Sequence, residues 1–119
     1  MQEQIPQNLP MTLIHGDVFF DNLIVQGERL VAIIDFEEAC HYYRSFDLGM
    51  AIVGTCRNRQ GISFQKVRKF LHGYQNNMSL ESAERESLKT FVVYAAVEMQ
   101  TLADTISEYS DSSFTGLFG

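Results

Sequence analysis

Four polar residues in the first third of the chain have side chains that suit proton transfer and metal binding. His15, Asp17 and Asn22 lie within one short segment, and Asp35 follows an apolar run. A carboxylate such as Asp17 can take the proton of an attacking hydroxyl group. The side-chain oxygens of Asn22 and Asp35 are of the kind that Mg²⁺ binds, with phosphates and water as its other ligands. The pattern therefore indicates a general base beside a Mg²⁺ site.

A β-hairpin is expected to bring the two metal ligands together. Two apolar, β-branched runs, residues 22–26 and 30–34, are separated by Gly27-Glu28-Arg29, and this arrangement predicts an antiparallel hairpin. A turn centred between Glu28 and Arg29 places Asn22 directly opposite Asp35, with their Cβ atoms about 4.5–5.5 Å apart. A register shift of one residue would remove this pairing.

Three motifs together resemble the aminoglycoside phosphotransferase and choline kinase superfamily, the small-molecule relatives of protein kinases. They are His15-Gly16-Asp17 with Asn22, then Ile34-Asp35-Phe36-Glu37, then Asp47-Leu48-Gly49, and the resemblance is specific over residues 12–54. It implies ATP-dependent transfer of a phosphoryl group to the hydroxyl of a small molecule, with Mg²⁺ as cofactor.

The resemblance also implies a role for each matching residue. Asp17 is the expected catalytic base, and Asn22 and Asp35 are the expected ligands of Mg²⁺ and, through it, of ATP. His15 is expected to brace the loop and Asp47 to anchor it from the following helix. Two more residues, Asp21 and Glu37, are candidates to contact metal or substrate; the alternative is that both are solvated.

A weaker resemblance covers residues 63–107. Phe70-Leu71-His72-Gly73-Tyr74-Gln75 and Ala83-Glu84-Arg85 are similar to segments of the bacterial-type homoserine kinases of the superfamily. Homoserine is therefore the leading substrate, with hydroxylysine, choline and aminoglycosides as alternatives. Position alone adds three candidates for the acceptor site: His41, Tyr42 and Arg44.

Half of such an enzyme is missing from the sequence. A kinase needs a lysine on a strand to hold the α- and β-phosphates, usually under a glycine-rich loop. The three lysines, Lys66, Lys69 and Lys89, all follow the catalytic segment in helix-like stretches, and no G-x-G-x-x-G occurs. Only 14 residues precede His15, too few for a nucleotide-binding lobe.

We therefore expect one α+β domain over residues 1–119, the mostly helical C-terminal lobe of a protein-kinase-like fold. The partner would be an N-terminal lobe, in cis or in trans, and the isolated lobe is expected to be inactive. The sequence leaves open whether the chain is a natural truncation or a fragment. Two alternatives remain: a non-catalytic half-kinase or interaction module, and a metal-binding protein without transfer chemistry.

The rest of the chain reads as helices. A buried helix is expected over residues 46–57, capped by Ser45, and a second helix is capped by Ser63. Spacings of three and four predict a long helix over residues 80–106, followed by a Ser-rich loop or frayed end at 107–113. Three apolar residues near the end of the sequence either dock on the helices or mark where a longer chain was cut: Phe114, Leu117 and Phe118.

Composition excludes several classes of protein. The net charge of −6 disfavours nucleic acid as a partner, because binding it requires clustered Lys and Arg. No apolar run approaches the ~20 residues of a membrane span, and residues 1–6 lack the features of a signal peptide. Cys40 and Cys56 are expected to be free thiols. These observations favour a cytoplasmic protein.

Overall fold

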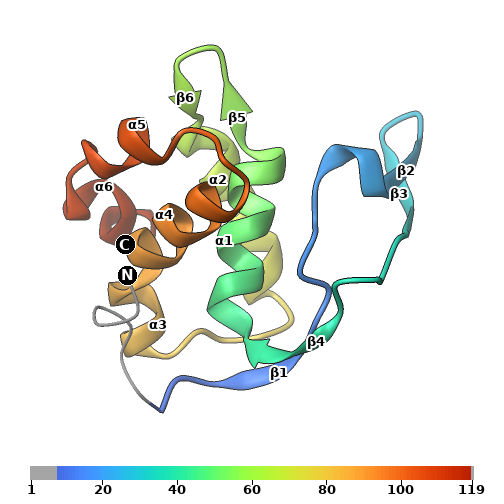
Figure 1. Cartoon of the computed structure of the whole chain (residues 1–119), viewed down its shortest axis with the longest axis horizontal. Helices are drawn as coiled ribbons and strands as arrows, with labels where there is room; N and C mark the ends of the chain where they lie inside the picture. Colours follow the sequence, from blue (N-terminus) through green and yellow to red (C-terminus); the bar gives the residue numbers. More distant parts are fainter. Residues whose placement is uncertain (1–7, 119) are drawn as a thin grey trace.

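Helices form the body of the protein, and short two-stranded antiparallel sheets are attached to it (Figure 1). The computed structural model describes residues 8–118; the prediction that residues 1–6 are no signal peptide falls outside them. The strands are β1 Met11–Ile14, β2 Leu23–Gln26, β3 Arg29–Ile33, β4 Cys40–Tyr43, β5 Arg57–Asn58 and β6 Gly61–Ile62. The helices are α1 Arg44–Thr55, α2 Phe64–Gln75, α3 Ser82–Glu86, α4 Leu88–Glu98, α5 Ala103–Ser107 and α6 Asp111–Thr115, with 3-10 turns η2 Phe20–Asn22 and η3 Gly116–Phe118. The expected α+β class with a mostly helical lobe is confirmed.

The core lies where α1 packs against α4. Ile52 and Val53 of α1 and Val92 of α4 are fully buried in it. The two helices meet at Gly49, where a Cβ atom would lie 2.5 Å from the carbonyl oxygen of Phe91. Glycine thus allows the two backbones to touch, and helix α1 is the buried helix that the apolar run predicts.

Of the two predicted helix caps, one is confirmed and the other is wrong. Ser63 caps α2, because its Oγ accepts a hydrogen bond from the backbone N–H of Lys66 at 3.3 Å. The prediction that Ser45 caps α1 was wrong. Strand β4 runs directly into α1, so Tyr43 occupies the N-cap position without a side-chain bond, and Ser45 is buried inside the first turn.

The predicted long helix over residues 80–106 is three shorter helices, α3, α4 and α5. The chain leaves helical geometry at Ser87, and Gln100 and Leu102 have φ values of 56° and 60°. Apolar residues at helical spacing still face the core in each piece, since Leu88, Phe91 and Ile106 are buried. The periodicity therefore identified the buried face but not the breaks.

The loop or frayed end expected at residues 107–113 is confirmed only for residues 108–110, because α6 begins within the predicted range. Helix α5 ends at Ser107 and α6 begins at Asp111. Phe114 and Leu117 are buried against the helical body, so the final apolar residues dock on the helices. No helix within residues 8–118 is both long and apolar enough to cross a membrane.

Candidate active site

The segment that carries Asp17 connects β1 to η2, and helix α1 holds its beginning. β1 is fixed by antiparallel pairing with β4. The carboxylate of Asp47, in the first turn of α1, accepts hydrogen bonds from the backbone N–H of Gly16 at 2.8 Å and of His15 at 3.3 Å. Gly16 has φ = 84°, and a Cβ atom there would lie 2.9 Å from the carbonyl oxygen of Glu38. Glycine is therefore required where the loop passes this anchor.

The His15 ring joins this loop to the end of the hairpin. Its Nδ1 accepts a hydrogen bond from the backbone N–H of Asp17 at 3.1 Å, and its Nε2 lies 2.8 Å from the carbonyl oxygen of Ile34. Because the N–H of Asp17 can only donate, the proton of the neutral ring belongs on Nε2. The Phe36 ring packs edge-on against His15, with ring centroids 4.6 Å apart. One imidazole thus links the segments that carry Asp17 and Asp35.

Asn22 holds the carboxylate of Asp17. Its Nδ2 donates to the backbone carbonyl of Asp17 at 2.8 Å and to Asp17 Oδ2 at 3.2 Å. Turn η2 places Asn22 for these bonds, because the backbone N–H of Asn22 donates to the carbonyl oxygen of Phe19 at 2.9 Å. The amide nitrogen thus faces Asp17, and the amide oxygen is of the kind that can bind a metal ion.

The hairpin forms, but in a register different from the predicted one. The turn is at Gly27-Glu28, one residue earlier than expected, and a bulge lies between Ile24 and Val25. As a result the backbone N–H of Ile34, not Asp35, pairs with Asn22, through its carbonyl oxygen at 2.9 Å. The prediction that Asn22 and Asp35 face each other directly was wrong, although they remain offset by one residue at the open end.

Asp35 leaves the hairpin in a left-handed backbone conformation, with φ = 62°. Asp and Asn are the non-glycine residues that adopt this conformation most readily. Its side chain is exposed, and Oδ1 accepts a hydrogen bond from the backbone N–H of Glu37 at 3.5 Å. Asp21 and Glu37 are exposed as well, and their part in binding stays a prediction.

The residues at this site fit Mg²⁺ better than a transition metal. In the described part of the chain, no three His, Cys, Asp or Glu side chains gather around one point. A closed zinc site would need four such ligands. Mg²⁺ needs only one or two protein oxygens because it keeps water and substrate phosphates as ligands. Asn22 and Asp35 supply two oxygens of that kind.

Comparison with known proteins identifies the family. Residues 1–87 match the phosphotransferase enzyme family. The chain belongs to this family. It is similar to the homoserine kinases of Rhodopseudomonas palustris, at 31% identity over 86% of this chain and 32% of the relative, and of Nitrobacter hamburgensis, at 32% identity over 82% and 30%. The homoserine kinase of Agrobacterium fabrum is also similar, at 34% identity over 70% of this chain and 26% of the relative. The chain therefore spans about a third of the length of these relatives.

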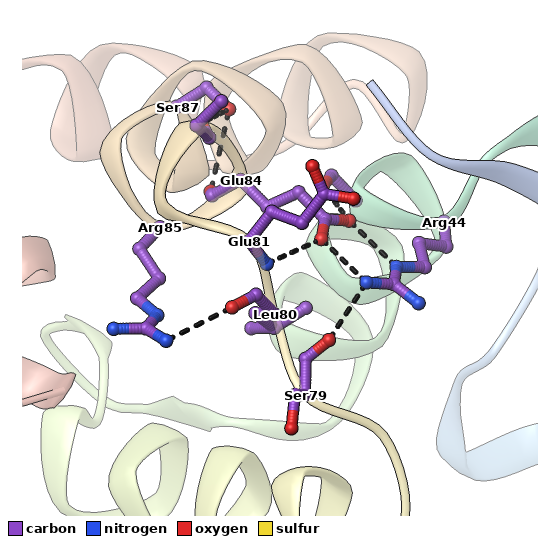
Figure 2. Close-up of polar contacts among 9 residues, drawn as sticks. Arg44, Ser79, Leu80, Glu81, Glu84, Arg85 and Ser87 are labelled. Atoms are coloured by element: carbon purple, nitrogen blue, oxygen red, sulfur yellow. Dashed lines mark hydrogen bonds and ion pairs between the residues drawn. The ribbon is translucent and has the colours of Figure 1, made fainter. Parts of the chain in front are cut away.

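Arg44 lines a hollow beside β1 and the hairpin together with Asp47, and its place at the acceptor site stays a prediction. Its guanidinium group forms two hydrogen bonds with the Glu84 carboxylate, at 2.8 and 2.7 Å, and a third with the Ser79 carbonyl, at 2.8 Å (Figure 2). The side chain thus joins the start of α1 to α3. The other position-based candidates differ in exposure: His41 is exposed, and Tyr42 packs edge-on against Phe46.

Glu84 was not predicted as a structural residue, and it is almost completely buried. Burial alone would raise the pKa of its carboxyl group. Hydrogen bonds from Arg44, from the backbone N–H of Glu81 and from the Ser45 hydroxyl outweigh that effect and lower the pKa below its usual range. The sequence contained one signal, because Glu81 and Glu84 have the spacing of a capping box.

Proposed function

We propose that the chain is the catalytic lobe of an ATP-dependent kinase that phosphorylates the hydroxyl group of a small molecule, with homoserine as the first substrate to test. One observation carries the proposal: the Asp17 carboxylate is held by Asn22 on a loop that His15 and Asp47 fix in place. Similarity to homoserine kinases over most of the chain supports the choice of substrate.

Each residue has a role in the proposed reaction. The hydroxyl oxygen of the substrate attacks the γ-phosphorus of ATP, ADP leaves, and the Asp17 carboxylate accepts the hydroxyl proton. Mg²⁺, when bound, would neutralise charge on the phosphates. Asn22 and Asp35 would hold it through their side-chain oxygens, and the amide group of Asn22 would at the same time keep Asp17 aimed at the acceptor.

We propose further that a second lobe covers the catalytic segment and supplies the missing lysine. Ten of the twelve large hydrophobic side chains exposed in the described residues lie between Met11 and Phe36. Neighbouring hairpin residues point to opposite faces, yet Leu30 and Val31 are 53% and 52% exposed. A strand that is apolar on both faces is usually buried on both.

A hollow beside the hairpin supports the same partner. It measures about 290 Å³ and lies between β1, the hairpin and helices α1 and α2, lined mostly by apolar side chains that include Leu13, Ile33 and Phe70. The relatives are about three times as long as the part matched here. A lobe contributed by that additional length, in cis or in trans, would bury these surfaces.

The lysines of this chain do not replace such a lobe. Lys66 and Lys69 are exposed on α2, and Lys66 Nζ donates to the carbonyl oxygen of Arg57. Lys89, on α4, lies 3.7 Å from the carboxylate of Asp111. We therefore propose that the 119-residue chain alone does not transfer phosphate. An ATP-dependent reaction and two free cysteines suit a cytoplasmic location.

The test begins with the native length of the polypeptide, measured by intact mass or immunoblot in its source cells. The native-length protein is then assayed for ADP release with Mg-ATP and homoserine, alongside hydroxylysine, choline and an aminoglycoside. We expect turnover with homoserine and a loss of about 10³-fold or more in Asp17→Asn, since the loss of a general base typically costs 10²–10⁴-fold. Glu28→Gln, at the exposed hairpin turn, is the matched control and should retain activity. Turnover unaffected by Asp17→Asn would rule out the proposed mechanism.

A further inference from the structure

We propose that helix α1 holds the segment carrying Asp17 at two points, and that Gly54 is the second of them. The proposal rests on the proposed function only in naming Asp17 as the base. Gly54 is a positioning residue in this scheme and touches no substrate. The first point is Asp47, whose carboxylate binds the backbone of His15 and Gly16.

The second contact requires the absence of a side chain. Gly54 is buried in the last turns of α1, directly under the backbone of Val18 and Phe19. A Cβ atom at position 54 would overlap the carbonyl oxygen of Val18 and lie 3.1 Å from the Cα atom of Phe19. The nearest blocking atoms belong to the backbone of Val18 and Phe19 and not to a flexible side chain. The loop that contains these two residues would therefore have to move.

The spacing of the two contacts restrains Asp17 between them. Residues 47 and 54 are two helical turns apart on the same face, which corresponds to about 10.5 Å. Along the loop, the backbone N–H of Gly16 is bound by Asp47 and the carbonyl group of Val18 lies against Gly54. Asp17 is therefore the one residue between the two contacts, and both of its chain neighbours are held by α1.

A second glycine contact in the same helix provides a matched control. At Gly49 a Cβ atom would overlap the backbone of Phe91 in α4, on the side of the core. Gly49→Ala and Gly54→Ala therefore make the same chemical change in the same helix against a backbone carbonyl. Only Gly54→Ala should displace the loop, whereas both should lower the melting temperature.

Backbone NMR of the 119-residue chain tests the proposal without any assay of activity. In Gly54→Ala we expect shifted signals for the backbone amides of Gly16 and Asp17. We also expect hydrogen exchange at the backbone amide of Asn22 to be faster by about tenfold or more. In Gly49→Ala these three amides should keep their wild-type signals and exchange rates. Unchanged loop amides in Gly54→Ala, or equal changes in the two variants, would overturn the proposal.

Relaxation measurements on the wild-type chain provide a second test should Gly54→Ala fail to fold. The Asp17 amide should have an order parameter near the rigid value of ~0.85. An order parameter at Asp17 as low as that of the Gly27-Glu28 turn would overturn the two-point proposal. Neither experiment depends on phosphoryl transfer, so a native-length protein that is inactive toward all four acceptors would refute the proposed function while leaving this inference intact.

Discussion

Single hydrogen bonds decide the orientation of the polar side chains around Asp17. The amide group of Asn22 cannot be reversed without placing an oxygen against the Asp17 carboxylate, so its nitrogen faces that carboxylate. The backbone N–H of Asp17 likewise makes Nδ1 of His15 the acceptor and leaves the ring proton for the Ile34 carbonyl. At this scale the geometry follows from donor and acceptor identity alone.

The residue with the largest predicted effect on stability is Glu84, outside the active site. Glu84→Gln removes the charge that balances Arg44 and should lower the free energy of unfolding at pH 7 by about 3 kcal/mol, the lower end for a broken buried pair. Urea denaturation measures this directly. Glu86→Gln changes an exposed residue of the same helix, and it should stay within about 0.5 kcal/mol of wild type.

The same pair predicts how stability depends on pH. The pKa of Glu84 is lower in the folded protein than the ordinary value of 4.5. The carboxylate therefore contributes its full stability above about pH 4.5, and the contribution is lost as pH falls through the lower, folded pKa. The stability gap between wild type and Glu84→Gln should narrow over this acidic range. Parallel stability curves from pH 7 to pH 3 would contradict the assignment.

At the scale of secondary structure, local patterns predicted the faces of the helices better than their ends. Apolar spacing located the buried sides of residues 88–106, yet Gln100 and Leu102 both adopt left-handed backbone geometry. Neither residue is a glycine, so the sequence did not predict these breaks in the helix. Ser45 has the residue type of a cap, but β4 continues straight into α1 and Glu84 takes its hydroxyl instead. Such outcomes depend on tertiary contacts that periodicity does not contain.

The hairpin shows the same limit for the active site. Two apolar, β-branched runs located both strands, and Gly27 supplied the positive φ of 61° that the turn requires. The bulge at Ile24 and Val25 has no sequence signal, and it changes which residue faces Asn22. Residue identities could therefore name candidates for the site, whereas the pairing of these candidates required the three-dimensional structure.

One helix should gain stability from a substitution. Gly73 lies in α2, and a Cβ atom there would meet no other atom within 4 Å. Gly73→Ala should raise the free energy of unfolding by about 0.5 kcal/mol, because alanine restricts the unfolded chain more than glycine does. Thermal and urea unfolding measure the change. A destabilised Gly73→Ala would mean that α2 packs more tightly than the structure indicates.

At the scale of the whole molecule, apolar surface is distributed very unevenly. The helical body closes over its own core, and Phe91, Val92 and Phe114 are completely buried. The segment that carries Asp17 and the hairpin instead leave apolar side chains exposed on both faces, and Figure 1 shows the hairpin standing to one side of the helices. Exposed apolar surface on this scale marks an interaction site, so the isolated chain should associate with itself when no lobe covers the hairpin.

Substitutions on the hairpin test this expectation. Val25 and Val31 are 54% and 52% exposed, and threonine keeps their shape and β-propensity while adding a hydroxyl group. The double variant Val25→Thr/Val31→Thr should weaken self-association by about tenfold, equivalent to ~1.4 kcal/mol, measured by sedimentation velocity across a concentration series. Val97→Thr is the control, because Val97 is 49% exposed on α4, away from the hairpin. If Val97→Thr weakened self-association as much as the double variant does, the hairpin would not be the specific contact surface. A second lobe would then have to bind the helical body instead.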